Sequence, residues 1–160
     1  MSTRDEVPFS TTLHVRDHCL CLHVQRAARA LARRFDEALR EVGLNNGQFS
    51  MMMSLNRPEP PTMQQVAGLL AMDRTTLTAK LKPLQREGLV QIAPDARDKR
   101  SRRLSLTDKG RRVLASAVPI WQREHGMLDG ELGDARGKRM RADLFAVSFP
   151  AAAAEKAGQA

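Results

Sequence analysis

The sequence predicts a mainly α-helical protein that carries a single small β-hairpin. Apolar side chains recur at steps of three and four from Leu20 to Val42, which is the period of an amphipathic helix. Residues 89–93 and 103–106 instead alternate apolar with polar side chains around a polar stretch, a pattern typical of two paired strands. The predicted order is helix, helix, two helices joined by a tight turn, hairpin, helix, helix.

The first predicted helix is also the longest. It runs over residues 13–42 and ends at Gly43, because glycine readily takes the left-handed conformation that follows many helices. A helix of about 30 residues is ~45 Å long, more than a domain of this size covers by itself. We therefore expect it to pack against a second subunit. A short buried helix is expected next, over residues 47–56.

Polar caps mark the starts of the two helices that follow. Thr62 and Gln65 have the spacing of a capping box. The side chains expected to face inward from that helix are Met63, Val66, Leu69 and Leu70. After a turn, Asp73 is a good N-cap for a helix over residues 74–87, which Gly88 ends.

Two more helices are expected toward the end of the chain. Thr107 caps the first, which Pro119 is expected to kink, and the second covers residues 134–149. The outer helices are predicted to form a dimerisation region around a central domain. The predicted boundaries are 13–45 and 107–149 for the dimerisation region, 46–106 for the central domain, and 1–12 and 150–160 for flexible termini.

Positive charge is concentrated in one quarter of the chain. Residues 73–112 hold twelve Lys and Arg against five Asp and Glu, so this segment carries +7 of the net charge of +8. Such a patch attracts phosphate backbones or anionic lipid surfaces. A lipid-binding helix would need bulky apolar residues opposite the bases, and residues 97–103 contain none. Nucleic acid is therefore the favoured partner.

Several function classes lack their sequence signatures. The chain has no run of about 20 apolar residues for a membrane helix and no apolar signal-peptide core in its first ten residues, so we expect a cytoplasmic protein with no membrane partner. The two cysteines cannot build a disulfide scaffold. No Gly-rich phosphate loop, Gly-x-Ser-x-Gly elbow or paired zinc motif is present, so neither an enzyme nor a cofactor is expected.

Two short helices joined by a tight turn and followed by a basic hairpin make up a winged helix-turn-helix. An α-helix fits the major groove of DNA, where the base edges present a distinct pattern of donors and acceptors. A protruding hairpin can place an arginine in the adjacent minor groove. The central domain is therefore predicted to bind double-stranded DNA. The same geometry occurs in proteins that bind no DNA, so an interaction module that binds protein or RNA is the alternative.

The same segments resemble the MarR family of bacterial regulators. The similar parts of the helix-turn-helix are Leu-Ala-Met-Asp-Arg-Thr-Thr-Leu-Thr at residues 70–78 and Leu-Gln-Arg-Glu-Gly-Leu-Val at residues 84–90. Residues 98–107 resemble the family's wing motif, Asp-x-Arg-x-x-x-Val/Leu-x-Leu-Thr. The resemblance implies an obligate homodimer that binds palindromic operators, usually as a repressor released by a small ligand or by oxidation.

The resemblance also assigns residues to DNA. Thr75 and Thr76 match positions that enter the groove at the start of the recognition helix, although they could simply form its first turn. Arg100 matches the wing arginine of the minor groove, and Asp98 the acid that braces the wing's basic side chains. Phosphate contacts are expected from Arg97, Lys99, Arg102 and Arg103. The full predicted DNA-binding set is Arg74, Thr75, Thr76, Thr78, Lys80, Lys82, Arg97, Asp98, Lys99, Arg100, Arg102 and Arg103.

One departure from the family concerns base recognition. Ala79 stands in the middle of the recognition helix, where many members carry an arginine, so the family's base preference does not transfer. Pro83 is also unusual, because proline deletes the helix hydrogen bond to the carbonyl of Ala79.

The two cysteines supply an alternative function, a redox-switched regulator that acts through Cys19 or Cys21. Both lie near the start of the long helix, where the oxidation-sensing branch of the family keeps its reactive cysteine. Two residues on a helix are about 200° apart, so the thiols could not bond to each other without unwinding, although a disulfide between subunits stays open. That branch activates its cysteine with tyrosines, and this chain has none.

A small-molecule effector is the remaining predicted partner, and the family favours aromatic acids. The candidate contacts are His14, His18, Met51 and Met52. Methionines of this kind equally suit a packed core. His14, His18 and His23 share no common helical face, so three ligands do not converge and no metal site is predicted.

Overall fold

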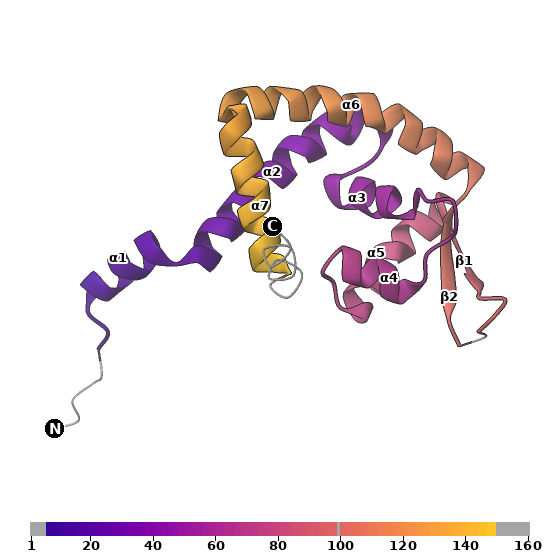
Figure 1. Cartoon of the computed structure of the whole chain (residues 1–160), viewed down its shortest axis with the longest axis horizontal. Coiled ribbons are helices and arrows are strands. Elements are labelled where there is room, and N and C mark those ends of the chain that lie inside the picture. The colour runs from indigo at the N-terminus through magenta and orange to yellow at the C-terminus, as the bar shows by residue number, and fades with distance from the viewer. Residues whose placement is uncertain (1–5, 99, 150–160) are drawn as a thin grey trace, which may run out of the picture.

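Two long helices, α2 and α6, form the frame of the molecule (Figure 1). The computed structural model describes residues 6–98 and 100–149. In chain order the elements are α1 (Phe9–His18), α2 (Leu20–Leu39), the 3₁₀ turn η1 (Arg40–Val42), α3 (Asn46–Leu55), α4 (Met63–Leu69), α5 (Arg74–Arg86), β1 (Val90–Pro94), β2 (Arg102–Leu106), α6 (Asp108–Leu132) and α7 (Asp134–Ser148). The predicted mainly helical fold with one hairpin is confirmed.

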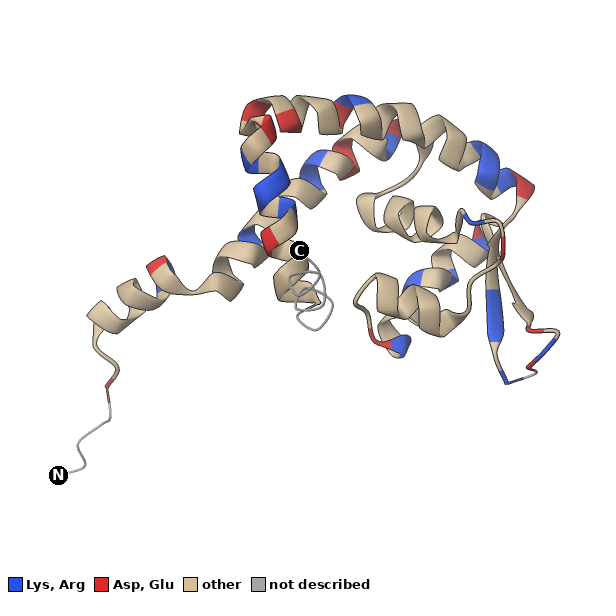
Figure 2. Cartoon of the chain, viewed as in Figure 1, with Lys and Arg blue, Asp and Glu red and all other residues tan. Residues whose placement is uncertain are grey.

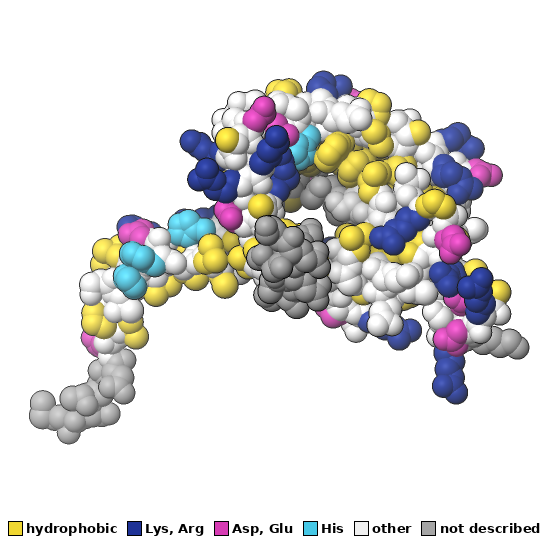
Figure 3. All heavy atoms as spheres, viewed as in Figure 1, with side chains coloured by type: hydrophobic (Ala, Val, Ile, Leu, Met, Phe, Trp, Pro, Cys, Tyr) yellow, Lys and Arg dark blue, Asp and Glu magenta, His cyan; other side chains and the backbone are white. Residues whose placement is uncertain are grey.

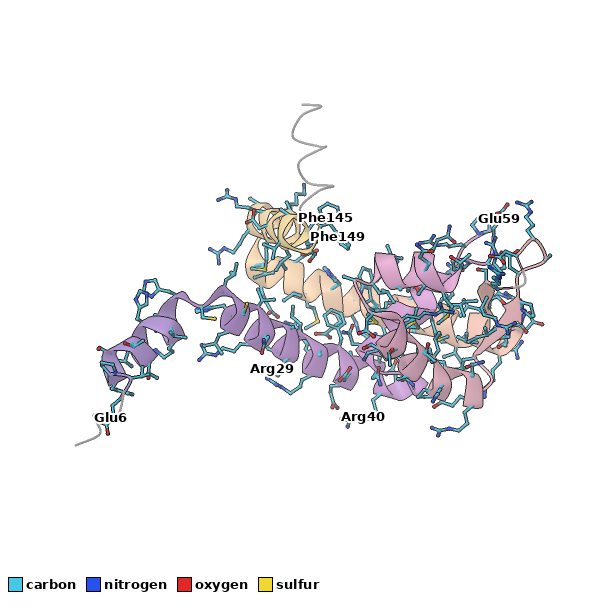
Figure 4. All side chains as sticks on the ribbon, turned by 90° about the horizontal axis from the view of Figure 1, so that it is seen from below. Glu6, Arg29, Arg40, Glu59, Phe145 and Phe149 are labelled. Carbon is cyan, nitrogen blue, oxygen red and sulfur yellow. The ribbon has the colours of Figure 1, made fainter. Side chains whose placement is uncertain are left out.

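The elements form two lobes that α6 connects. Its first half packs on α3 and β2, beside which α4, α5 and the hairpin are gathered, and its body packs along α2. Helix α7 turns back from the far end of α6, while α1 projects away from the rest of the chain (Figure 1). Figure 4 shows the rings of Phe145 and Phe149 together at the end of α7, with centroids 5.2 Å apart. None of the described helices is long and apolar enough to cross a membrane.

The prediction of one continuous helix over residues 13–42 is wrong. The helix begins at Phe9, breaks at Cys19, whose ψ of 105° is extended, and resumes at Leu20. Helix α1 buries no residue against this chain, so no packing of an apolar face holds it in line with α2. The end of the helical stretch agrees with expectation, because Gly43 has a left-handed φ of 72°.

The predicted caps are confirmed. The Thr62 hydroxyl accepts the Gln65 N–H at 3.2 Å while the Gln65 side chain accepts the Thr62 N–H at 2.9 Å, which completes the capping box of α4. Asp73 caps α5 and Thr107 caps α6 through the N–H groups of Thr76 and Gly110. Leu69 differs from expectation: it is 51% exposed, because α4 ends there and only Val66 of this short helix is fully buried.

The central lobe is built around the buried face of α5. Leu77, Leu81 and Leu84 recur at helical spacing and are fully buried. Burying a side chain of this kind contributes about 1.5–3 kcal/mol. Other fully buried side chains complete this core: Leu39, Met51, Met52, Val66 and Leu104.

The hairpin pairs β1 and β2 antiparallel, with Val90 opposite Leu106 and Pro94 opposite Arg102. β1 begins and ends one residue later than predicted, and β2 begins one residue earlier, which leaves the predicted pairing of the two segments unchanged. The Leu104 N–H donates to the Pro61 carbonyl at 2.9 Å, so the hairpin is also joined to the segment before α4.

The first turn of α6 lies against the chain just before β1. A Cβ at Gly110 would stand 2.0 Å from the Leu89 carbonyl oxygen, an atom that already accepts the Thr107 N–H at 3.0 Å. Because this hydrogen bond fixes the Leu89 carbonyl, the oxygen cannot move away from an added methyl group, and only glycine fits at position 110.

We expect Gly110→Ala to lower the free energy of unfolding by about 1–3 kcal/mol or more, the cost of overpacking a closed site. Gly126→Ala is the matched control, because Gly126 is an exposed residue of the same helix with nothing within 4 Å of its added Cβ. That variant should gain up to about 1 kcal/mol from helix propensity. Urea unfolding followed by circular dichroism at one protein concentration measures both, and equal stability of the two variants would contradict this packing.

Candidate nucleic-acid interface

The N-terminus of α5 is organised by Asp73. Its Oδ1 accepts the Thr76 N–H at 2.8 Å, and its Oδ2 accepts the Thr76 hydroxyl at 2.6 Å. The Thr76 hydroxyl and then its N–H hold the pKa of Asp73 below its usual range. Thr76 is predicted to contact DNA, but its hydroxyl already donates its hydrogen to Asp73. The hydroxyl oxygen can therefore only accept a hydrogen bond from a base or another group.

The exposed face of α5 carries most of the other predicted contacts. Arg74, Thr75, Thr78, Ala79 and Lys82 line one shallow depression of about 380 Å³ along the helix. The Thr78 hydroxyl donates to the Arg74 carbonyl at 2.8 Å. Four of these five are predicted DNA contacts, and they share a face because they recur at helical spacing.

Lys80 lies on a different side of the same helix. It borders a separate depression with Pro83 and the start of α3, at Asn45, Gly47 and Gln48. The structure therefore does not bring Lys80 together with the other predicted residues of α5.

The wing and the helix-turn-helix share a second depression, of about 410 Å³. Its cationic lining comes from Arg74 on α5 and from Arg100 and Arg102 on the wing. Arg74 borders both depressions, so it joins the exposed face of α5 to the wing. Figure 2 shows the Lys and Arg residues along β2 and at the tip of the hairpin.

The wing tip is closed by Asp98, but not as predicted. Its Oδ1 accepts the Arg100 N–H at 2.9 Å, and its carbonyl accepts the Ser101 N–H at 2.9 Å. Within the described ranges, 6–98 and 100–149, Asp98 makes no ion pair with a basic side chain. It shapes the turn that carries Arg100 instead of bracing the bases. Lys99, another predicted contact, lies outside the described residues.

The acid that braces the wing is Asp95, which the sequence analysis missed. It is 6% exposed, and its Oδ2 accepts the Arg103 Nε–H at 2.5 Å. Its Oδ1 accepts the Arg97 N–H at 2.8 Å. The Arg97 N–H and then the Arg103 guanidinium hold the pKa of Asp95 below its usual range. The signal in the sequence was the hairpin register: Arg103 lies opposite Ala93, two residues before Asp95, so Arg103 and Asp95 are diagonal neighbours on one face.

Arg103, predicted to contact phosphate, is thus paired within the protein. Its Nη1 also donates to the Pro60 carbonyl at 2.8 Å, and its side chain stays 32% exposed. Arg97, Arg100 and Arg102 are exposed, as a phosphate or groove contact requires. Arg97 lies on the side of the wing that faces Glu59, away from the depression that Arg100 and Arg102 share.

An apolar groove of about 530 Å³ lies between α6 and the pair formed by α3 and α4 (Figure 3). Phe49 of α3 and Trp121 of α6 stand at its centre, with ring centroids 6.1 Å apart. The rest of the lining is Ser50, Met53, Ser54, Leu69, Leu70, Val118 and Gln122.

The predicted ligand contacts are not brought together at this groove. Met51 and Met52 are 1% and 0% exposed, because they point from α3 into the core, and Met53 is the methionine that faces the groove. His14 and His18 are exposed on α1 and stack on each other with ring centroids 4.1 Å apart. None of these four residues lines the groove.

The cysteines lie at the helix break. Cys19 is half-buried, Cys21 is exposed, and both are free thiols. The Cys19 carbonyl is 2.9 Å from His23 Nδ1. No group of three or more His, Cys, Asp and Glu side chains in the described part of the chain could hold a metal ion.

Comparison with known proteins gives a consistent set of relatives. Residues 44–101 match the model of the MarR family. The crystal structure of the transcriptional regulator MosR of M. tuberculosis in complex with DNA is 36% identical, with a TM-score of 0.76 over 86% of this chain and 98% of that chain. The transcriptional repressor CouR bound to a 23-mer DNA duplex is 26% identical, with a TM-score of 0.74 over 90% of this chain and 99% of that chain.

Curated regulators match over a shorter stretch. TtmR of Methylorubrum extorquens is 35% identical over 95 residues, which is 59% of this chain and 49% of TtmR. Across three such regulators, TtmR among them, the match covers 49–62% of the relative's length, so the chain spans about half the length of the curated relatives it matches.

These relatives are transcriptional regulators and not enzymes. The match to MosR extends over nearly the whole of both chains at 36% identity. The family model covers the helix-turn-helix and the wing tip, including Asp73, Asp95 and Arg100. The chain therefore belongs to the MarR family of transcriptional regulators.

Proposed function

We propose that this protein is a homodimeric regulator that binds palindromic double-stranded DNA through α5 and the wing, and that a small ligand releases it. The observation that carries this proposal is the cationic face that runs from Lys82 through Arg74 to Arg100 and Arg102. The related MosR, 36% identical, has been crystallised in complex with DNA, which supports the same role here.

On this proposal the exposed face of α5 enters the major groove. Thr75 and Thr78 are short enough to let the helix approach the base edges, and Arg74 reaches base or phosphate at the rim. Ala79 offers no hydrogen bond to a base. A larger share of the sequence preference then falls on the wing, where Arg100 can enter a narrow, electronegative A·T-rich minor groove.

A second copy is part of the proposal because apolar surface remains uncovered at the far end of the molecule. The exposed large apolar side chains of α1, α2 and α7 include Phe9, Val15, Leu20, Met140, Leu144 and Val147. Helix α1 buries nothing within its own chain. Two-fold pairing through this surface would present two identical wings, and such symmetry matches a palindromic site.

Two substitutions separate base reading from phosphate binding. Arg100→Ala should cost about 1–3 kcal/mol on the operator and relax the preference for A·T-rich flanks. Lys82→Ala, farther along α5, should weaken all duplexes about equally and lower the salt slope by about one unit. For the wild type, neutralising six to ten phosphates would remove about 10³–10⁵ in affinity between 50 and 200 mM salt.

The measurement is a titration of the duplex from the protein's own promoter region beside a scrambled duplex of the same composition. Circular dichroism and light scattering serve as controls, since both variants should keep the fold and the dimer. Equal losses of affinity on the two duplexes for Arg100→Ala would show that the wing binds DNA without reading its sequence. A flat salt response of the wild type would argue against a nucleic-acid partner.

The apolar groove is the proposed effector site. It lies between α3 and α4, which adjoin the recognition helix, and α6, which continues to the outer helices. A ligand seated there contacts the helices beside the recognition helix and also α6, so it can change the spacing of the two wings. Phe49 and Trp121 suit an aromatic ring, while Ser50 and Gln122 suit polar substituents.

Trp121 is the one tryptophan of the chain, so its fluorescence reports on the groove directly. We expect 4-hydroxybenzoate or 4-hydroxybenzamide, as probes, to quench this fluorescence and to release the DNA. Met53→Arg should abolish both effects by filling the groove. Ala115→Arg places the same charge on an exposed position of α6 outside the groove lining and should preserve them. Release of DNA by a probe that leaves Trp121 unchanged would place the effector elsewhere.

The helix break favours a second candidate, the redox-switched regulator. Because Cys19 has an extended backbone, the 200° separation expected on a continuous helix does not apply at this point. Hydrogen peroxide would oxidise two thiols to a disulfide, with its oxygens leaving as two waters.

On this second candidate, peroxide should weaken DNA binding in the wild type and not in Cys19→Ser. Non-reducing electrophoresis distinguishes a bond between subunits from one within a chain. DNA binding that is unchanged in oxidised protein would leave the ligand-released regulator as the sole candidate.

A further inference from the structure

We propose that Asp95 and Arg103 form a clamp that sets the position of the wing on the helix-turn-helix, so that Arg103 is a positioning residue for DNA recognition and not a DNA contact. The proposal rests on the proposed function, because the wing matters in this way only for a protein that binds DNA.

The clamp joins three segments that are separate in the sequence. Asp95 follows β1, Arg103 lies in β2, and Pro60 belongs to the turn before α4. Arg103 reaches both of the others, through Nε to the Asp95 carboxylate and through Nη1 to the Pro60 carbonyl. Next to it the Leu104 N–H bonds to Pro61, and Arg103 itself pairs as an isolated bridge with Thr62, the cap of α4.

A two-stranded hairpin by itself is marginally stable and does not fix its own orientation. The wing needs an anchor outside its own ladder, and the turn before α4 provides it. Because α4 leads directly into the recognition helix, an anchor at this point relates Arg100 to the exposed face of α5. The planar guanidinium suits the task, since it bonds two acceptors in different directions at once.

The burial of Asp95 indicates that its charge has a structural role. A buried carboxylate is costly unless it is paired and hydrogen-bonded, and Asp95, 6% exposed, uses both oxygens. An acid inside a basic wing would repel DNA if it acted only through its charge. Pairing neutralises the positive charge of Arg103, which would attract DNA, and keeps the negative charge of Asp95 in the wing. The pair therefore does not help DNA binding through charge, and its contribution is to fix the position of the wing.

The direction in which Asp95→Asn changes operator affinity therefore distinguishes a role through charge from a role through geometry. Asp95→Asn removes a negative charge from the DNA-facing lobe, so charge alone predicts tighter binding to every duplex. The clamp predicts the opposite for the operator, a loss on the order of tenfold, comparable with removing one sequence-reading contact. Affinity for the scrambled duplex should stay the same or rise, so the specificity ratio falls.

Glu59→Gln is the matched control. Glu59 is an exposed acid beside the same turn, and it borders the same shallow depression as Asp95 and Arg103 (Figure 4). Its replacement removes the same charge without touching the clamp. We expect a small rise in affinity for both duplexes and an unchanged specificity ratio.

A second pair of variants tests Arg103 from the other side. Arg103→Lys keeps the charge and loses the two-directional geometry, so it should lower operator preference as Asp95→Asn does. Arg123→Lys makes the same exchange at an exposed position of α6 outside the proposed DNA-binding face, and it should be tolerated. Circular dichroism confirms the fold of each variant, and the lysine variants preserve the test if Asp95→Asn fails to fold.

Amide hydrogen exchange gives a readout that does not depend on DNA. Asp95→Asn and Arg103→Lys should speed exchange of the Leu104 amide, which bonds to Pro61, while Glu59→Gln should not. If the wild type binds neither duplex, the proposed function fails and the exchange data still decide whether the clamp exists. Operator affinity that rises in Asp95→Asn as in Glu59→Gln, or Arg103→Lys that matches the wild type in both readouts, would overturn the clamp.

Discussion

The buried face of α5 is the contact on which the rest of the DNA-facing surface depends. Leu77, Leu81 and Leu84 occupy one side of this helix and are fully enclosed by α3, α4 and the hairpin. Because a helix has a fixed period, burying that side leaves Arg74, Thr75, Thr78 and Lys82 on the opposite one. The same packing directs Lys80 elsewhere. A few leucines thus determine which polar side chains can reach a ligand as large as DNA.

Helix α6 transmits this arrangement to the rest of the molecule. Its N-terminal half contributes Leu114, Ala117 and Ile120 to the central core. Farther along, Arg34 of α2 forms a two-pronged ion pair with Glu131 at 2.7 and 2.8 Å and also bonds to Glu124. Helix α6 is therefore held at both ends. Trp121 lies in its middle, between the part that packs on the central core and the part that is ion-paired with α2.

The wing illustrates why counting charges gives an incomplete picture of a DNA-binding surface. Arg97, Arg100 and Arg102 are exposed, whereas Arg103 is neutralised by Asp95. All four look alike in the sequence. Only the contacts distinguish them: three side chains are exposed, and the fourth is bonded to a carboxylate and to the turn before α4.

Local chemistry by itself determined the elements. Thr62, Asp73 and Thr107 cap helices as their sequence context indicates, since capping involves residues three positions apart. The tertiary structure alone decided the break at Cys19, the choice of Met53 over Met51 and Met52 at the groove, and the pairing of Asp95 with Arg103. The break lies beside a helix, α1, that has no buried residue of its own. The methionine at the groove depends on which side of α3 is covered, and the ion pair depends on the approach of the hairpin to Pro60. The last two are set by contacts between segments distant in the sequence, which no local pattern records.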